Sequence, residues 1–116
     1  MRFAVRVIRL AEALPKSVRG RVVAQQLCRS GTSVAANYRS ALRSKSRADF
    51  ANKISIVLEE ADESHFWIEL IAEAGLLPEQ RLRALASEAE ELVRIFAATR
   101  RTARNRESRI GNHESS

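Results

Sequence analysis

The chain has few of the residues that cross-link or interrupt a fold. Its 116 residues include one cysteine, two prolines and four glycines, and aromatic residues make up 5%. Because Cys28 is the only cysteine, no disulfide can form within the chain, which fits a reducing compartment. We interpret Cys28 as a small buried helix residue. The dominant residues are alanine, leucine, glutamate and arginine, which favour helices. We therefore expect a single all-α domain.

The chain also has no long apolar run. Arg2, Arg6 and Arg9 interrupt the N-terminal segment, so it matches neither a signal peptide nor a membrane-spanning helix. We expect a cytoplasmic protein that does not interact with membranes.

Apolar residues recur at alternating spacings of three and four in four segments, the spacing of one face of a helix. In the third segment, for example, Phe50, Ile54 and Val57 begin a stripe that continues to Ile71. Long amphipathic helices with short connections predict an antiparallel up-down four-helix bundle. The predicted helices span residues 1–14, 18–43, 47–74, and 78 or 79 to about 99.

Local signals mark the ends of these helices. Pro15 ends the first helix and Ser17 is a candidate cap of the second. Ser46, with Asp49 three residues later, resembles a capping box, and Gly75 is placed to end the third helix in a left-handed conformation. We expect the bundle to occupy residues 1–104 and a disordered polar tail to occupy residues 105–116.

Positive charge is expected to gather at one end of such a bundle. The formal net charge is +6, and the half made of residues 31–59 and 92–104 holds nine basic and two acidic residues, a net +7. Such an end attracts phosphates, although a solvated basic turn without a ligand remains the alternative. Tyr38 is the only aromatic candidate for stacking there, which argues against sequence-specific reading of single strands. The candidate nucleic-acid-binding residues are Arg39, Arg43, Lys45, Arg47, Arg100, Arg101 and Arg104.

Several polar residues occupy positions where a core is expected. Glu60 and Glu63 share a helical stripe with Trp67, and two carboxylates in a core stripe need partners. Arg29 is the natural partner because its guanidinium can bind a carboxylate with two donors. We predict a structural or interfacial polar network that specifies register and assembly. Its expected members are Gln26, Arg29, Asn37, Glu60, Glu63 and Trp67.

No catalytic or metal-binding pattern accompanies these carboxylates. A di-metal bundle needs Glu-x-x-His pairs, whereas Glu60 and His65 are five residues apart and do not share a helix face. His113, the other histidine, lies in the predicted tail. No glycine-rich phosphate loop and no nucleophile–histidine–acid set is present in the sequence. We predict a non-enzymatic protein without a metal or cofactor.

The same residues carry a resemblance to a known family. The second predicted helix contains Gln26-x-x-Arg29-Ser30-x-x-Ser33-Val34-x-x-Asn37. The third contains Ser46-x-x-Asp49-Phe50 and then Glu60-x-x-Glu63-x-x-x-Trp67, with Gly75 after it. In this order and at this separation, over roughly residues 3–98, the motifs resemble the four-helix-bundle family related to the 23S rRNA intervening-sequence proteins.

The resemblance implies an antiparallel four-helix bundle that assembles into a ring-like homopentamer. Relatives include the accessory variability protein of diversity-generating retroelements, which binds nucleic acid and a reverse transcriptase through a basic surface. Many members carry an acidic residue where this chain has Arg39, so its basic end is more positive than theirs.

Two functions follow as expectations. The first is an oligomeric bundle, expected to be a homopentamer from the resemblance. Its basic end binds RNA or DNA through phosphates, with or without a protein partner. Ile56, Trp67 and Leu70 support the oligomer, because they form a second apolar stripe beyond what one small core needs. The alternative is a protein-interaction scaffold with no nucleic-acid ligand.

Overall fold

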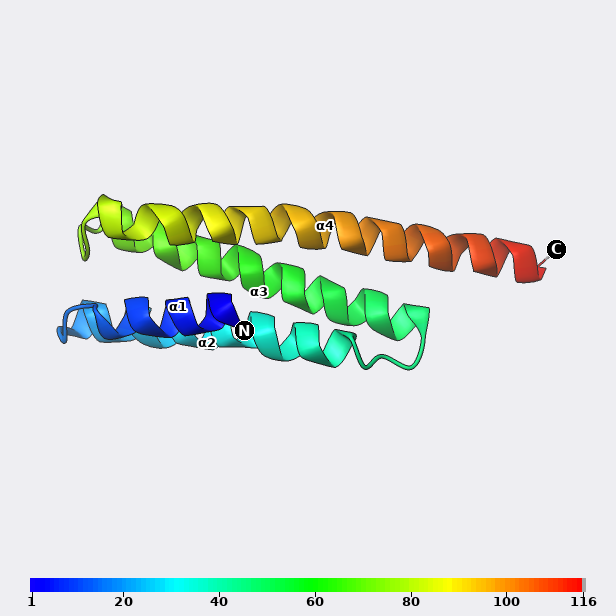
Figure 1. The fold of residues 1–116 in the computed structure, drawn as a ribbon, viewed down its shortest axis with the longest axis horizontal. Helices are drawn as coiled ribbons and strands as arrows, with labels where there is room; N and C mark the ends of the chain where they lie inside the picture. Colours follow the sequence, from blue (N-terminus) through cyan, green and yellow to red (C-terminus); the bar gives the residue numbers. More distant parts are fainter. Residues whose placement is uncertain (116) are drawn as a thin grey trace.

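The protein is an antiparallel up-down bundle of four helices, as the spacing of apolar residues predicts. The computed structural model describes the backbone of residues 1–115 and the side chains of residues 1–106. Consecutive helices run in opposite directions along one long axis (Figure 1). The helices are α1 (Arg2–Glu12), α2 (Val18–Ala41), α3 (Arg47–Glu73) and α4 (Glu79–Ser115).

The short first helix makes the two ends of the bundle different. α3 packs against both α2 and α4, while α1 packs mainly against α2. α1 begins near the middle of the bundle and runs towards the end that holds the α1–α2 and α3–α4 turns (Figure 1). The other end, which holds the α2–α3 turn, is therefore built from only three of the described helices.

The core follows the predicted stripes closely. Along α3, Ile54, Val57, Ala61 and Ile71 are fully buried, and they meet buried residues of the other three helices, such as Leu27 of α2. Phe50, the first residue of that stripe, is only half-buried. It lies at the three-helix end, where α1 does not reach.

The predicted boundary signals act as expected. The Ser17 hydroxyl accepts a hydrogen bond from the Gly20 amide at 3.2 Å, and the Ser46 hydroxyl accepts one from the Asp49 amide at 3.0 Å. Gly75 has a φ of 66°, a left-handed conformation that suits glycine. The Gly75 amide bonds the Ala72 carbonyl and the next amide bonds the Ile71 carbonyl, which is the Schellman arrangement of a helix end.

Other helix ends differ from the prediction by a few residues. α1 ends at Glu12 rather than residue 14, and α2 ends at Ala41 rather than residue 43. In both places the backbone amides after the helix donate hydrogen bonds to carbonyls three residues back. The Leu14 amide bonds to the Ala11 carbonyl and the Ser44 amide to the Ala41 carbonyl. These tighter bonds are common where a helix ends and satisfy carbonyls that would otherwise lack a partner.

α4 is longer than the sequence predicts. The apolar stripe fades after residue 99, and residues 105–116 were expected to form a disordered polar tail. The backbone instead continues as a helix to Ser115, while Ser116 lies outside the described residues. Extending an existing helix adds a hydrogen bond per residue without a new nucleation cost, so polar residues can continue it. The described helices include none with the length and hydropathy needed to cross a membrane.

Candidate nucleic-acid interface

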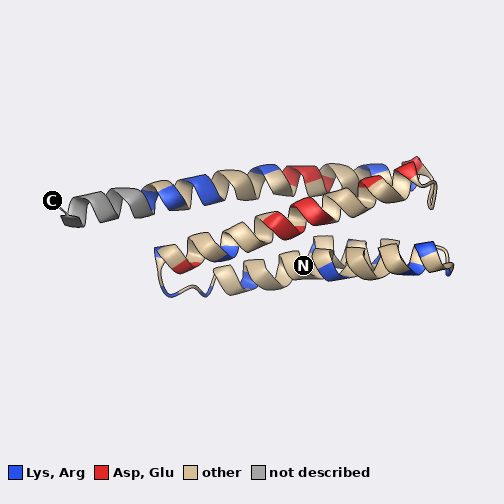
Figure 2. Cartoon of the chain, turned by 180° about the vertical axis from the view of Figure 1, so that it is seen from behind, with Lys and Arg blue, Asp and Glu red and all other residues tan. Residues whose placement is uncertain are grey.

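The predicted basic residues lie on three helices and one turn at the three-helix end. Arg39 is in the last turn of α2, Arg43 and Lys45 are in the α2–α3 turn, and Arg47 begins α3. Arg100, Arg101 and Arg104 lie on the C-terminal part of α4. Acidic positions concentrate towards the α3–α4 turn, and basic positions dominate α4 beyond them and the region of the α2–α3 turn (Figure 2). The fold therefore produces the charge separation that the sequence predicts.

These seven cations are open to solvent and available to an anion. All are exposed except Arg100, which is half-buried, and none forms an ion pair with a carboxylate of the described side chains. Arg104 donates a hydrogen bond to the Ser55 hydroxyl of α3 at 3.3 Å, which holds α4 against α3. By contrast, Lys53 pairs with Asp49 at 3.2 Å, so that lysine is largely neutralised. The positive charge at this end therefore remains uncompensated.

A cavity at this end includes residues that were not predicted as site residues. It has a volume of about 370 Å³ and lies between the start of α3 and the last part of α4. Phe50 was assigned to the core stripe, and Arg106 fell in the predicted tail. No local sequence signal links residues 50 and 106, because they meet only through the register of α3 against α4. The lining residues are Arg47, Phe50, Ala98, Thr99, Thr102, Ala103 and Arg106.

The polar network forms between α2 and α3 of a single chain. The Arg29 guanidinium donates to Glu60 at 3.2 Å and, through its other terminal nitrogen, to Glu63. Its Nε donates to the Gln26 side-chain oxygen at 3.4 Å, and the Trp67 indole donates to Glu63 at 3.3 Å. Five of the six predicted members are therefore brought together.

Asn37 does not join this network. Its side-chain amide donates to the Ser33 carbonyl at 2.9 Å and to the Ser33 hydroxyl at 2.8 Å, one turn back on the same helix. Asparagine side chains readily form such local bonds to the preceding turn of backbone. Asn37 is also about two turns further along α2 than Arg29.

The network is more exposed than a core network. The Arg29 side chain is 49% exposed, whereas those of Glu60 and Glu63 are 18% and 34% exposed. The Glu63 pKa lies below its ordinary value, chiefly because Arg29 donates to the carboxylate and to a lesser extent because Trp67 does. Burial opposes this shift. The Arg29 pKa is raised, first by its hydrogen bond to Glu63.

A second polar contact between α2 and α3 is fully buried. The Ser64 hydroxyl lies 2.9 Å from the Ser30 hydroxyl, and both side chains are completely inaccessible to solvent. Ser30 also reaches the Leu27 carbonyl at 3.2 Å, and Ser64 reaches the Glu60 carbonyl at 2.9 Å. Each hydroxyl is satisfied, so this pair lets the two helices approach closely without an unpaired polar group. Ser30 and Ser64 each fall at the spacing of an apolar stripe, but no local sequence signal pairs them across the two helices.

Cys28 is the one cysteine of the chain and lies in α2. Burial, followed by the nearby Glu12, raises the pKa of the half-buried Cys28 thiol, which disfavours the reactive thiolate. Within the part of the chain that the structure describes, no group of three or more histidine, cysteine, aspartate or glutamate residues is placed to hold a metal ion.

Comparison with known proteins agrees with the fold and the motifs. The family model of the 23S rRNA-intervening sequence protein matches residues 1–98. A crystal structure of a protein of unknown function from the S23 ribosomal protein family of Bacteroides thetaiotaomicron is 34% identical. That comparison covers 84% of this chain and 91% of the other, with a TM-score of 0.79. No curated protein matches the chain significantly. With most of its length matched by the family model, the chain belongs to the family of 23S rRNA-intervening sequence proteins.

Proposed function

We propose that this protein is a non-enzymatic, homo-oligomeric bundle that binds nucleic acid through phosphate contacts at its three-helix end. One observation carries the proposal: seven lysine and arginine side chains gather there without an acidic partner among the described side chains. Lysine and arginine contacts to phosphate supply most of the affinity of non-specific nucleic-acid binding.

Assembly would strengthen this binding. A homo-oligomer, such as the ring-like pentamer that the family resemblance implies, repeats the basic end around one axis. Several weak phosphate-binding sites held together bind a long polyanion much more tightly than one site does. The single cysteine agrees with a reducing, cytoplasmic location, where such ligands are available.

The test is a salt series with a matched pair of variants. Replacing Arg43, Lys45 and Arg47 by alanine removes three charges from the basic end. Replacing Lys16, Arg19 and Arg21 removes three charges from the opposite end, where the α1–α2 turn lies (Figure 1). The second variant keeps the same net charge as the first and controls for a general electrostatic effect.

We expect wild type and the Lys16/Arg19/Arg21 variant to bind a mixed RNA and DNA pool at about 50 mM salt and to lose affinity steeply by about 200 mM. The Arg43/Lys45/Arg47 variant should bind more weakly, with a slope of log affinity against log salt that is smaller by up to about 3. Unrelated sequences should bind with similar affinity, because phosphate contacts carry no sequence information. Equal binding by the two triple variants would remove this end as the binding site.

The second candidate function is a protein-interaction scaffold. Exposed large apolar side chains favour it, because Leu42 at the α2–α3 turn is 64% exposed and Phe66 of α3 is 54% exposed. If wild type shifts no nucleic acid even at low salt, this alternative replaces the first.

A further inference from the structure

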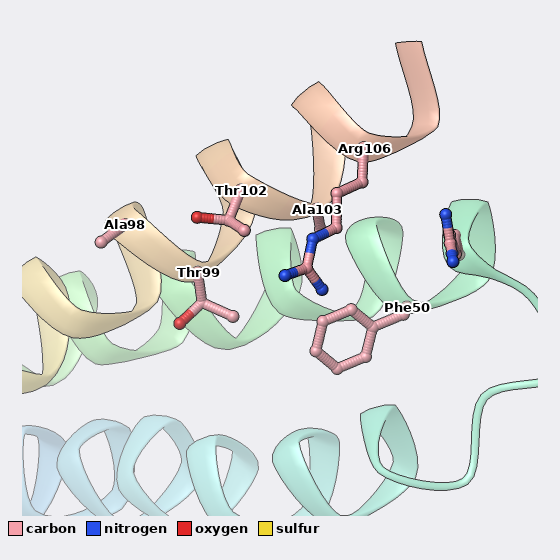
Figure 3. A pocket seen from close by; sticks show the side chains of 7 residues that line it. Phe50, Ala98, Thr99, Thr102, Ala103 and Arg106 are labelled. Atoms are coloured by element: carbon pink, nitrogen blue, oxygen red, sulfur yellow. The ribbon is translucent and has the colours of Figure 1, made fainter. Parts of the chain in front are cut away.

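The basic end contains a cavity whose chemistry differs from that of a simple charged patch. About 370 Å³ of space lies between α3 and α4, within the range of about 300–1,000 Å³ typical of small-molecule pockets. One arginine comes from each side, Arg47 from α3 and Arg106 from α4, and none of the described side chains that line the cavity is acidic. Figure 3 shows the Arg106 side chain extending from α4 towards the Phe50 ring, with Thr99 and Thr102 on the α4 wall.

Phe50 also lines a second hollow. The second hollow has a volume of about 390 Å³ and lies on the α2–α3 turn. Both spaces are lined by Arg47 and Phe50, so the two hollows share an aromatic residue and a cationic residue. The residues lining the second hollow are Ala41, Leu42, Ser44, Lys45, Ser46, Arg47 and Phe50.

Two cations line the second hollow. Lys45 and Arg47 are both exposed, and both belong to its lining. A phosphate group matches such a pair of cations.

We propose that the two hollows form a binding path for single-stranded nucleic acid, with one base stacked on Phe50 and adjacent phosphates held by Arg47 and Arg106. Single-strand sites combine a basic groove with an aromatic side chain on which a base stacks, and both are present here. In a duplex the bases are already stacked on one another and cannot reach Phe50 without being extruded. This inference rests on the proposed function and deepens it, because it distinguishes single strands from duplexes at the same end of the molecule.

The experiment compares a fluorescent single strand of about 12 nucleotides with a duplex of the same sequence, using anisotropy at low salt. Phe50→Leu removes the aromatic face and keeps an apolar side chain, while Phe50→Tyr keeps the ring. Phe66→Leu is the matched control, because Phe66 is an exposed aromatic residue of the same helix that lines neither hollow. Circular dichroism establishes that each variant is folded.

We expect wild type, Phe50→Tyr and Phe66→Leu to bind the single strand more tightly than the duplex. Phe50→Leu should bind the single strand about 5- to 100-fold more weakly, with duplex affinity unchanged within about twofold. If Phe50→Leu binds the single strand as tightly as wild type does, the stacking site is overturned while the proposed function stands. If wild type binds neither ligand, the proposed function fails and this inference fails with it.

A second pair of variants tests the site without altering a half-buried residue. Arg106→Gln removes a charge from the exposed rim of the cavity, and Arg83→Gln removes one from an exposed position near the opposite end of α4. Arg106→Gln should reduce the slope of log affinity against log salt for the single strand by about 0.7, whereas Arg83→Gln should leave it unchanged. Equal slopes for the two variants would overturn the role of Arg106 and the proposed path.

Discussion

Small residues at one level of α2 let its neighbours pack at close range. Gly31 lies against α1, and a Cβ at this position would be 2.5 Å from a methyl group of Val7. Next to it, Ser30 meets Ser64 of α3 inside the core. A side chain at Gly31 would therefore require Val7 to shift.

Gly31→Ala should destabilise the protein by about 1–3 kcal/mol, although alanine usually stabilises a helix by about 1 kcal/mol relative to glycine. The added Cβ would collide with the fully buried Val7, and this clash outweighs the gain in helix propensity. Urea denaturation measures the change. In a Val7→Ala background the same substitution should cost less, because the two nearest methyl groups are gone. An equal cost in both backgrounds would contradict the proposed contact.

The Arg29–Glu63 contact predicts a dependence of stability on pH. The Glu63 pKa is lower in the folded protein than its ordinary value of 4.5. Its contribution to stability is therefore fully present above that value and is lost as the pH falls through the lower, folded pKa. Because the Glu63 side chain is 34% exposed, the contribution is small.

Glu63→Gln should make the acid-induced fall in melting temperature shallower between pH about 5 and about 3, because the glutamine cannot titrate. Thermal unfolding followed by circular dichroism measures this. The exposed Glu59→Gln serves as a control and should leave the pH profile close to that of wild type. Identical profiles for Glu63→Gln and wild type would show that the contact with Arg29 does not affect stability.

At the scale of elements, the two middle helices carry their own capping residues. Ser17 caps α2, Ser46 caps α3, and the Schellman bonds at Gly75 end α3. The α1–α2 turn is also sterically tight, because a Cβ at Gly20 would lie 1.9 Å from the Pro15 carbonyl oxygen. These local contacts determine where the chain reverses direction.

Ser17→Ala should destabilise the protein by about 0.5–2 kcal/mol through loss of the cap on α2. The Gly20 amide would lose its side-chain acceptor at 3.2 Å. Ser17→Asn keeps an acceptor and should retain most of the stability. The control is Ser87→Ala, at an exposed position within α4. Equal unfolding free energies for the two alanine variants would contradict the capping role.

At the scale of the whole molecule, the bundle is a rod of 60 × 21 × 20 Å with apolar side chains left on its surface. Trp67 and Leu70, expected to be surplus to the core, pack partly against it, whereas Ile56 is 43% exposed. Where α1 begins, a cavity of about 290 Å³ lies between α1, α2 and α4, bordered by Tyr38 and Ile95. These two residues are 41% and 48% exposed.

We expect the protein in solution to have a mass well above that of the 13.0 kDa chain. The family resemblance implies the mass of a pentamer. Association would cover the exposed apolar residues that a small bundle cannot bury on its own. Light scattering coupled to gel filtration at micromolar concentration measures the mass. The Arg43/Lys45/Arg47 alanine variant should have the same oligomeric state as wild type, because the three side chains are proposed to contact nucleic acid and not another subunit. A mass of one chain would contradict the homo-oligomer.

The sequence alone determined the all-α class, the up-down order of the helices and most of their ends. These features depend on apolar spacing, on caps such as Ser46, and on the glycine conformation at Gly75, all of which involve residues within a few positions of one another. The gathering of basic residues at one end also follows from the sequence, because reversing the chain at known turns places them there.

Only the tertiary structure decided which side chains meet across the helices. It placed Asn37 against Ser33 instead of Glu60, put Arg29 at a half-exposed position, and paired Ser30 with Ser64. It also brought Phe50 and Arg106 to one cavity, although they are 56 positions apart in the chain. Contacts of this kind depend on the rotation and register of packed helices. A shift of one residue along a helix turns the side-chain direction by about 100° around the helix axis.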